Sequence, residues 1–460
     1  MSVIMDMYST VLEYLHNKNY KIIHDLFSEM NEADIGEIFQ KIHEEQDLQK
    51  HEFIMLFRLL SKDVAADVFS YMDSDAQMLL INLFTDKELQ NVIDDLNIDD
   101  TVDIIEEMPA NIVAKILKNA DHETRKQINQ ILKYPKDSAG AIMTTEYVYL
   151  HKDYTVAEAL DWIRHVGMVK ETVYTLYVTQ NRKLIGVLSI LDLLTADMND
   201  KIEDIMDCNV IYADTMEDKE VVASIFAKYD FMALPVVDKE YRIVGIITFD
   251  DVMDVIQEEN TEDVAKMAAV APSEDSYFKT SVFTHAKNRI LWLLFLMLSA
   301  TLSGLVINHY EAAFSAVPVL VSFIPMLSGT GGNSGSQTSA MVIRAMSLGE
   351  ITPKDFFKVM FKEARIAVIC GVILAIVNAG RIIITYHNDP SVDCYKLALT
   401  LSLAIVITVF LAKLIAAVLP MLAQKLKIDP AVMAAPLITT IVDTCSVMVF
   451  FMLATVIFGV

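Results

Sequence analysis

Long apolar segments after Arg289 decide the fold class of this 460-residue chain. A helix that crosses the hydrocarbon core of a bilayer needs about 20 predominantly apolar residues, because lipid cannot satisfy backbone polar groups. The second segment is short and contains Pro318 and Pro325. The sequence predicts an all-α transmembrane domain of five helices within residues 286–460, at Ile290–Ile307, Ala312–Leu327, Ile366–Ile384, Leu397–Leu422 and Ala431–Val460.

Charge is divided unevenly between the two parts of the chain. From Ala286 onward there are 12 Lys and Arg and 8 Asp and Glu, whereas the residues before it include 25 basic and 54 acidic ones. The net charges are therefore +4 and −29. A strongly negative soluble part repels phosphate backbones, so nucleic acid is excluded as a partner and cations are its natural ligands.

Basic residues predict which side of the membrane each loop occupies. They gather at 287–289, 344–365 and 425–427, and these regions alternate with acidic loops containing Glu311 and Asp393. The positive-inside rule places the N-terminus in the cytoplasm and the C-terminus outside a multi-pass cell membrane protein. The first residues lack the basic and apolar regions of a cleaved signal peptide, which agrees with this orientation.

Residues 1–134 show helical periodicity interrupted by polar residues. A similar unit, an apolar helix end followed by Asn or Asp, recurs at Phe27–Asn31, Phe69–Asp73 and Ile93–Asn97. Asn and Asp side chains accept hydrogen bonds from the first free N–H groups of a helix, so they predict helix starts. The repeat indicates an α-helical N-terminal superhelical domain, and an ordinary helical bundle is the alternative.

Residues 137–258 contain a second internal repeat, in which short β-branched runs alternate with amphipathic stretches. A Gly-x-x-Ser/Thr-x-x-Asp pattern follows a strand twice, 59 residues apart. This signature resembles a tandem pair of CBS domains, with α/β units at 137–200 and 201–258. The matched segments are Ile142-Met143 with Ile205-Met206, Leu176–Val178 with Leu234–Val236, and Gly186–Asp192 with Gly245–Asp251.

Asp443 lies within the last apolar segment, where an ionised carboxylate costs about 2.5–3.5 kcal/mol on insertion scales. Thr439 and Thr440 precede it by one helical turn and Pro436 by two, so hydroxyls and a freed carbonyl would share its face. This stripe predicts the wall of an ion pathway. The alternatives are a neutral Asp443, or an ion pair with Lys413 of the preceding span.

The segment Gly329–Gln337, with the sequence GTGGNSGSQ, is the second unusual feature. Its glycines allow close helix approach and expose carbonyl oxygens, which suit hard cations, so Gly329 and Asn333 are predicted pathway residues. A role in packing alone is the alternative. No strand precedes the segment and no Gly-Lys-Ser/Thr follows it, which argues against a phosphate-binding loop.

Clusters of carboxylates in the acidic part form the third feature. Like charges about 6 Å apart repel by about 0.7 kcal/mol even at the dielectric constant of water. Acidic faces that dock together would therefore require a bound cation, whereas an undocked stripe would be a solvated face. The clusters are Asp99 and Asp103, Asp218 and Glu220, and the run Asp250, Asp251, Asp254, Glu258, Glu259, Glu262 and Asp263.

Together these residues resemble the MgtE family of magnesium channels over essentially the whole chain. The specific motifs are GTGGNSGSQ and PLITTIVD, the latter at Pro436–Asp443. The resemblance implies a connecting (plug) helix at 259–285, a homodimer with its pore between protomers, hydrated Mg²⁺ bound by Asp443, and no enzymatic activity. It also implies a cytosolic Mg²⁺ sensor, with Mg²⁺ bound by Asp99, Asp103, Asp218, Glu220, Asp251, Asp254, Glu259, Glu262 and Asp263.

Some members of this family bind ATP between the CBS domains. Tyr174, Asp192 and Phe231 match those contacts, whereas Leu191 stands where such members have a basic residue. Near the pore, Ala435 and Lys413 also replace polar amides of some relatives. The resemblance therefore makes ATP a candidate ligand alongside Mg²⁺.

The leading hypothesis is a channel that imports Mg²⁺ down its electrochemical gradient and closes when cytosolic Mg²⁺ occupies the acidic sensor. One alternative is transport of another divalent cation, such as Mn²⁺ or Co²⁺. The other is a membrane-anchored CBS receptor for nucleotides. A simple anchor requires neither a carboxylate at mid-membrane nor the Gly-rich segment, so the sequence favours transport.

Overall fold

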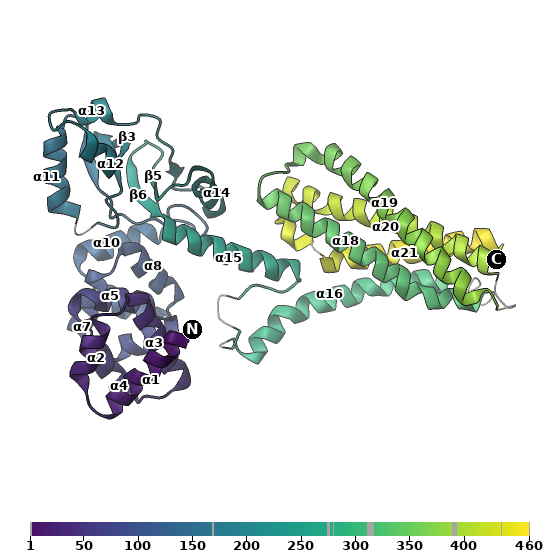
Figure 1. Ribbon diagram of the computed structural model, residues 1–460, viewed down its shortest axis with the longest axis horizontal. Helices are drawn as coiled ribbons and strands as arrows, with labels where there is room; N and C mark the ends of the chain where they lie inside the picture. The colour runs from purple at the N-terminus through teal and green to yellow at the C-terminus, as the bar shows by residue number, and fades with distance from the viewer. Residues whose placement is uncertain are drawn as a thin grey trace. The chain divides into compact units, whose positions relative to one another are not determined.

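The structure is a computed structural model that describes residues 2–167, 170–273, 277–278, 280–310, 317–388, 393–433 and 435–459. The chain forms two compact units, Met1–Ile256 and Gln257–Val460 (Figure 1). The first contains short helices followed by two small sheets, and the second contains long helices.

In the described part of the first unit, ten helices come first, most of them only two or three turns long. Asn31 and Asp73 cap α3 and α6 by accepting hydrogen bonds from Ala33 and Ala76 N–H groups, as predicted. Asn97 also occupies a capping position, at the start of α8, without a side-chain cap. The helices are α1 (Ser2–His16), α2 (Tyr20–Phe27), α3 (Glu32–Glu45), α4 (Lys50–Phe57), α5 (Lys62–Ser70), α6 (Ser74–Leu83), α7 (Asp86–Asp95), α8 (Ile98–Glu107), α9 (Ala110–Asn119) and α10 (His122–Ile131).

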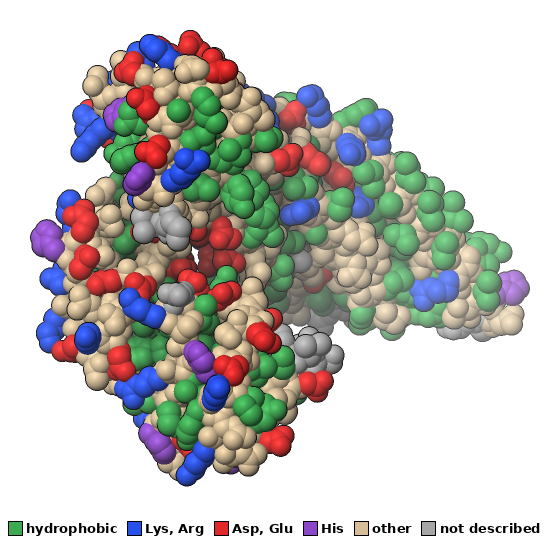
Figure 2. All heavy atoms as spheres, turned by 60° about the vertical axis from the view of Figure 1, so that its left-hand side comes forward, with side chains coloured by type: hydrophobic (Ala, Val, Ile, Leu, Met, Phe, Trp, Pro, Cys, Tyr) green, Lys and Arg blue, Asp and Glu red, His purple; other side chains and the backbone are tan. Residues whose placement is uncertain are grey.

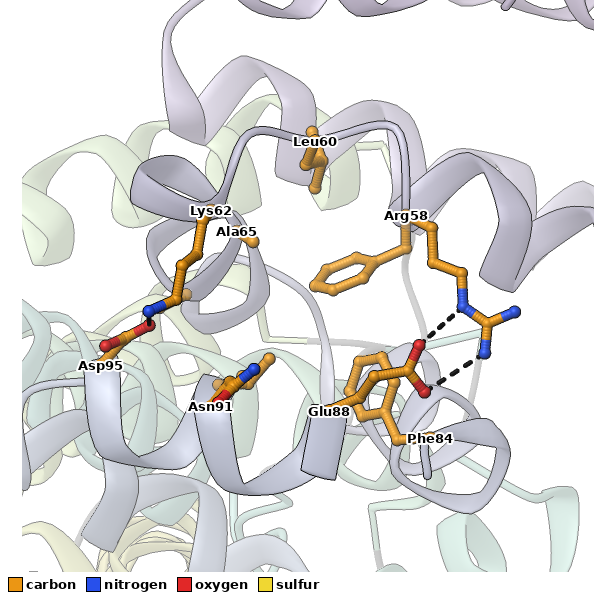
Figure 3. Close-up of a pocket in the computed structure, with 11 residues that line it drawn as sticks. Arg58, Leu60, Lys62, Ala65, Phe84, Glu88, Asn91 and Asp95 are labelled. Carbon is orange, nitrogen blue, oxygen red and sulfur yellow. Dashed lines mark hydrogen bonds and ion pairs between the residues drawn. The ribbon is translucent and has the colours of Figure 1, made fainter. Parts of the chain in front are cut away.

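Alternate helices of this domain pack against one another: α1 on α3, α3 on α5, α5 on α7 and α7 on α9. This pattern builds a superhelix whose core contains the ring contacts of Phe39 with Phe53 and of Phe57 with Phe84. A hollow of about 140 Å³ remains beside Phe57, and charged residues line its rim (Figure 3). The predicted superhelical N-terminal domain is thus confirmed.

The charged groups around this hollow pair with one another, and each pair joins α7 to an earlier helix. The Arg58 guanidinium donates to both oxygens of Glu88, at 2.7 and 3.2 Å (Figure 3). Hydrogen bonding to Arg58 lowers the pKa of Glu88 to about 2. Lys62 lies 3.6 Å from Asp95 on the other side. These pairs fasten neighbouring turns of the superhelix together.

The CBS pair consists of two three-stranded sheets of the same topology. In each, the first strand is parallel and the third antiparallel to the middle one. The predicted α/β repeat is therefore present in three dimensions. Its elements are β1 (Tyr149–His151), α11 (Val156–Val166), β2 (Thr175–Gln180), β3 (Lys183–Ser189) and α12 (Ile190–Thr195), then α13 (Ile202–Ile205), β4 (Ala213–Asp214), α14 (Lys219–Tyr229), β5 (Ala233–Val237) and β6 (Ile243–Thr248).

Reciprocal contacts between the repeats explain two of the matched sequence positions. A Cβ atom on Gly245 would lie 2.7 Å from the Met143 sulfur, and one on Gly186 would lie 2.5 Å from the Met206 sulfur. Each repeat therefore packs its methionine against the strand glycine of the other. The glycines recur because any side chain there would displace the partner methionine.

The helix α15 (Phe249–Met267) follows the last strand without a break. It begins inside the second CBS repeat and ends at Met267, whereas the sequence interpretation placed the connecting helix at 259–285. Val252 and Val255 are buried in the first unit. The acidic stripe predicted from sequence lies along this one helix.

Among the described residues of the second unit, four helices are long and apolar enough to cross a membrane. They lie within Val282–His309, Pro353–Tyr386, Cys394–Lys425 and Pro430–Phe458. The fifth long helix, α18, carries the glycine-rich motif and packs against α20 and α21. The full set is α16 (Val282–His309), η2 (Pro318–Phe323), α18 (Ile324–Ser347), η3 (Pro353–Asp355), α19 (Phe356–Tyr386), α20 (Cys394–Lys425), η4 (Pro430–Met433) and α21 (Ala435–Phe458).

The predicted second segment, Ala312–Leu327, differs from the observed helix. Residues 312–316 lie outside the described residues, and η2 precedes α18. Pro325 lies in the first turn of α18, where a missing N–H costs nothing. The two prolines therefore delay the helix start instead of breaking a span.

Candidate ion pathway and acidic sensor site

Asp443 lies in the third turn of α21 and faces α18. Its carboxylate hydrogen-bonds to the Ser328 side chain, one residue before the glycine-rich motif. The Oδ1 atom is buried and has no hydrogen-bond partner among the described residues. An unpartnered carboxylate oxygen inside an apolar bundle is costly, so it marks a position suited to a cation or to water.

The residues predicted beside Asp443 have different roles in α21. The Thr440 hydroxyl donates to the Pro436 carbonyl at 3.0 Å. The Thr440 hydroxyl, which was predicted to share the face of Asp443, is therefore engaged within its own helix. Pro436 itself lies in the first turn of α21 and does not interrupt the helix. Thr439 contacts α18, because a Cβ atom on Gly332 would lie 2.9 Å from its methyl group.

The glycine-rich motif is a continuous part of α18, and three of its glycines are packing positions. A Cβ atom on Gly331 would lie 2.8 Å from both Thr408 and Val442, and one on Gly335 would lie 2.9 Å from Ile438. The motif thus allows α18 to lie directly against α20 and α21. Because the backbone there is helical, the exposed carbonyls predicted from composition are engaged in the helix.

One face of α18 nevertheless remains exposed and polar. Gly329, Asn333 and Gln337 recur at intervals of four residues, and all three are exposed. A Cβ atom on Gly329 would contact nothing within 4 Å. Gly329 and Asn333, the two pathway residues predicted in this motif, therefore lie on the open face of the helix, whereas Gly331 and Gly335 lie on the packed face.

Lys413 is buried, but it does not form the ion pair with Asp443 that the sequence left as an alternative. Its ammonium group donates to the Thr338 hydroxyl at 3.0 Å. Among the described residues no ion pair joins it to an acid within 4 Å. Asp443 and Lys413 therefore have separate polar environments on α18.

Helix α8 presents acidic residues to the CBS pair in the first unit. Asp99 is 7% exposed, and its Oδ1 atom has no hydrogen-bond partner among the described residues. Burial, followed by the charges of Asp251 and Glu171, raises its pKa well above the usual range. Acidic side chains gather where the helical domain meets the CBS pair (Figure 2). The structure thus brings together Asp99 and Asp251, two of the predicted sensor acids.

The neighbouring acids are perturbed in the same direction. Burial raises the pKa of Asp251 to about 7, although hydrogen bonds from Thr248 act against this shift. Burial and the charge of Asp251 raise the pKa of Glu171 to about 7, and burial and Asp67 raise that of Asp100 to about 6. Ionised carboxylates in this cluster therefore oppose the contact unless a cation joins them.

No three His, Cys, Asp or Glu side chains among the described residues are grouped closely enough to enclose a metal ion. The arrangement agrees instead with Mg²⁺ that keeps several waters and contacts one or two carboxylates. The sequence interpretation missed Asp100 and Glu171. Asp100 adjoins Asp99, which was a signal, whereas Glu171 lies in a loop and only the tertiary structure places it here.

The other predicted acids lie elsewhere in the first unit. Asp103 follows one turn after Asp99 on α8, and Asp254 lies on α15, close enough to raise the pKa of Asp100. Asp218 caps α14 by accepting from the Glu220 N–H at 2.9 Å. Neither Asp218 nor Glu220 is among the acids that act most strongly on Asp99 or Asp251.

The last predicted sensor acids, Glu259, Glu262 and Asp263, lie on the part of α15 that belongs to the second unit. Lys266 forms ion pairs with Glu262 and, at 2.6 Å, with Asp429. Burial, followed by the charge of Asp429, raises the pKa of Asp263. Asp429, directly before η4, thus joins the acids of α15, a contact that the sequence did not indicate.

Comparison with known proteins agrees with this division of the chain. Residues 30–137 match the MgtE intracellular N domain, 139–199 and 202–258 match CBS domains, and 324–453 match the divalent cation transporter family MgtE. The magnesium transporter MgtE of Bacillus subtilis is 31% identical over 97% of this chain and 96% of its own length. This chain belongs to the MgtE family. The Thermus thermophilus magnesium transporter MgtE is also 31% identical, over 96% of both chains.

Two solved structures resemble part of this MgtE protein. The cytosolic domain of the Mg²⁺ channel MgtE in complex with ATP has a TM-score of 0.50 and 32% identity, and covers 54% of this chain and 99% of that one. The soluble part of a magnesium transporter has a TM-score of 0.51 and 29% identity, and covers 56% and 99%. Family membership and the apolar helices make this chain a multi-pass membrane protein.

The residues predicted to contact a nucleotide lie in the CBS pair of this MgtE protein. Tyr174 is 64% exposed, and Phe231 stacks on Tyr229 with ring centroids 5.5 Å apart. Asp192 caps α12 with Ser189, and the hydrogen bonds from Ser189 lower its pKa. Asp251 makes the equivalent bonds with Thr248 in the second repeat, so this carboxylate caps a helix in both repeats.

Proposed function

We propose that this MgtE protein carries Mg²⁺ across the membrane down its electrochemical gradient. The main support is the carboxylate of Asp443. Its Oδ1 atom is buried without a hydrogen-bond partner among the described residues, and the carboxylate hydrogen-bonds to the Ser328 side chain. A hydrated divalent cation supplies the missing interaction, because hard cations prefer oxygen ligands. The exposed face of Gly329, Asn333 and Gln337 continues the polar surface along α18.

The proposal includes a homodimer in the bilayer, with the N-terminus in the cytoplasm and the C-terminus outside. A polar helix face in a membrane domain is stable only against water or protein. A second copy would cover the exposed face of α18 and would leave a water-filled path between the protomers. The family is one of transporters, so the chain acts on an ion without an enzymatic step.

Cytosolic Mg²⁺ closes the pathway in this proposal. Ions at Asp99 and Asp251 cancel the repulsion between the helical domain and the CBS pair, and further ions act on Asp103, Asp218, Glu220 and Asp254 and on the acids of α15. Several ions that bind one state add their differential free energies, so closure is cooperative. ATP is a proposed second ligand, because a related cytosolic domain was solved with it.

Ion flux into liposomes containing the purified chain tests this function. Asp443→Asn should lower the initial Mg²⁺ flux at least about tenfold, since an amide loses the charge that offsets ion dehydration. Glu350→Gln, at an exposed acid after α18, is the control and should keep normal flux. Equal flux in both variants would refute the pathway, and competition by Mn²⁺, Co²⁺ and Ca²⁺ would rank its selectivity.

A further inference from the structure

Three polar side chains on three helices form a chain of hydrogen bonds inside the second unit. Lys413 of α20 is 5% exposed and donates from Nζ to the Thr338 oxygen at 3.0 Å. Thr338 of α18 is 2% exposed and donates its proton to Glu363 Oε2 of α19, also at 3.0 Å. The hydroxyl thus relays between an ammonium group and a carboxylate.

The direction of these hydrogen bonds agrees with opposite charges at the two ends. The Thr338 hydroxyl donates its only proton to Glu363, so its oxygen is free to accept from Lys413. This arrangement fits a charged ammonium group on Lys413 and a charged carboxylate on Glu363. Buried ammonium groups are costly unless a negative charge lies nearby. Among the described residues Thr338 is the only hydrogen-bond partner of Lys413, so Glu363 is the counter-charge that the relay provides.

This relay lies in the same bundle as Asp443. Gly335, one turn before Thr338, packs against Ile438 of α21. Thr338 follows Ser328, the partner of Asp443, by ten residues along α18, which corresponds to about 15 Å of helix. At an effective dielectric constant near 20, an uncompensated charge at that distance changes divalent-ion binding on the order of tenfold or more.

We propose that Lys413 is a built-in counter-ion for Glu363, which prevents this carboxylate from holding a transported divalent cation. Glu363 is half-buried, and only its Oε2 atom bonds to Thr338. Without a counter-ion it would be a second attractive site beside the pathway and would slow ion release. The inference rests on the proposed ion transport, and it makes Lys413 a positioning and specificity residue that does not itself touch the ion.

The test uses the full chain in liposomes and measures Mg²⁺ flux against Mg²⁺ concentration. Lys413→Met should lower the half-saturating concentration on the order of tenfold and reduce the maximal flux, because the freed Glu363 retains ions. Glu363→Gln should raise the half-saturating concentration, since an unpaired positive charge remains. The double variant should return within about twofold of wild type, because neither charge remains.

Two conservative variants separate electrostatics from packing. Lys413→Arg retains the charge and should preserve the half-saturating concentration. Thr338→Ser retains the relay and should do the same, whereas Thr338→Val should behave like a weaker Lys413→Met. A Lys413→Met variant that loses thermal stability but keeps the wild-type half-saturating concentration would overturn the proposal and assign the relay to packing alone.

Calorimetric Mg²⁺ binding to the detergent-solubilised chain gives a readout that does not depend on flux. Lys413→Met should bind one more Mg²⁺ per chain than wild type, and the Lys413→Met/Glu363→Gln variant should lose that ion. An unchanged count would refute the counter-ion role even if the variant transports nothing. Absence of flux in the wild-type chain would instead refute the proposed transport, so the two failures are distinguishable.

Discussion

Replacing Asp251 with Asn removes one of the charges that oppose contact between the helical domain and the CBS pair. Burial raises the pKa of Asp251 from 3.8 to about 7. When the helical domain contacts the CBS pair, ionising this carboxylate at alkaline pH therefore costs about 4 kcal/mol. Asn keeps an acceptor for the Thr248 hydroxyl but loses the stronger charged hydrogen bond. We expect a net stabilisation of about 2 kcal/mol without Mg²⁺.

The assay is thermal unfolding of residues 1–267 at pH 8, with and without Mg²⁺. This fragment corresponds to the cytosolic domains that were solved alone. Without Mg²⁺, Asp251→Asn should raise the midpoint by about 4–8 °C relative to wild type. The rise that Mg²⁺ produces in wild type should shrink in the variant, because one ion ligand is gone.

Glu37→Gln is the matched control, since Glu37 is an exposed acid in the middle of α3. It should leave both the midpoint and the Mg²⁺ increment unchanged. If Asp251→Asn behaved like this control, the acidic cluster would be a solvated face, and the sensor proposal would fail. In the full chain, Asp251→Asn should also make Mg²⁺ flux less sensitive to Mg²⁺ on the cytosolic side.

Three further outcomes are expected. Burial raises the folded-state pKa values of Asp251 and Glu171 to about 7. At acidic pH both side chains are neutral and the domain contact is fully stable, whereas this stability is lost as pH rises through 7 and the carboxylates ionise. The rise in unfolding temperature that Mg²⁺ produces should therefore be larger at pH 8 than at pH 6. A rise that does not depend on pH would contradict this expectation. Gly331→Val should cost about 1–3 kcal/mol in detergent melts, since its side chain would overlap both neighbouring helices, whereas Gly304→Ala, in open space, should not. Asp192→Ala should weaken ATP binding in calorimetry. If the wild-type fragment bound no ATP, the proposal that ATP is a second ligand would be wrong.

The linear sequence was sufficient for features that depend on local composition and periodicity. Runs of apolar residues predict membrane helices because each span must satisfy its own backbone, and the CBS repeat is readable because a strand, a glycine and a capping acid recur at fixed spacing. Asp443 could also be recognised from local composition, because it is a carboxylate within an apolar segment. The boundaries of α15 and α18 were less accurate, because propensity does not define where a helix ends.

Only the tertiary structure decided which polar groups meet. Glu171 joins Asp99 and Asp251 from a loop, and Lys413 contacts Thr338 across 75 positions in the chain. Such partners depend on how helices pack, and packing is set by shape over long sequence separations, which periodicity does not encode. The glycine-rich motif illustrates the difference. Its composition predicted both close helix approach and exposed carbonyl oxygens. The structure shows the first, because α20 and α21 fill the space beside its glycines, whereas the helical backbone engages the carbonyls.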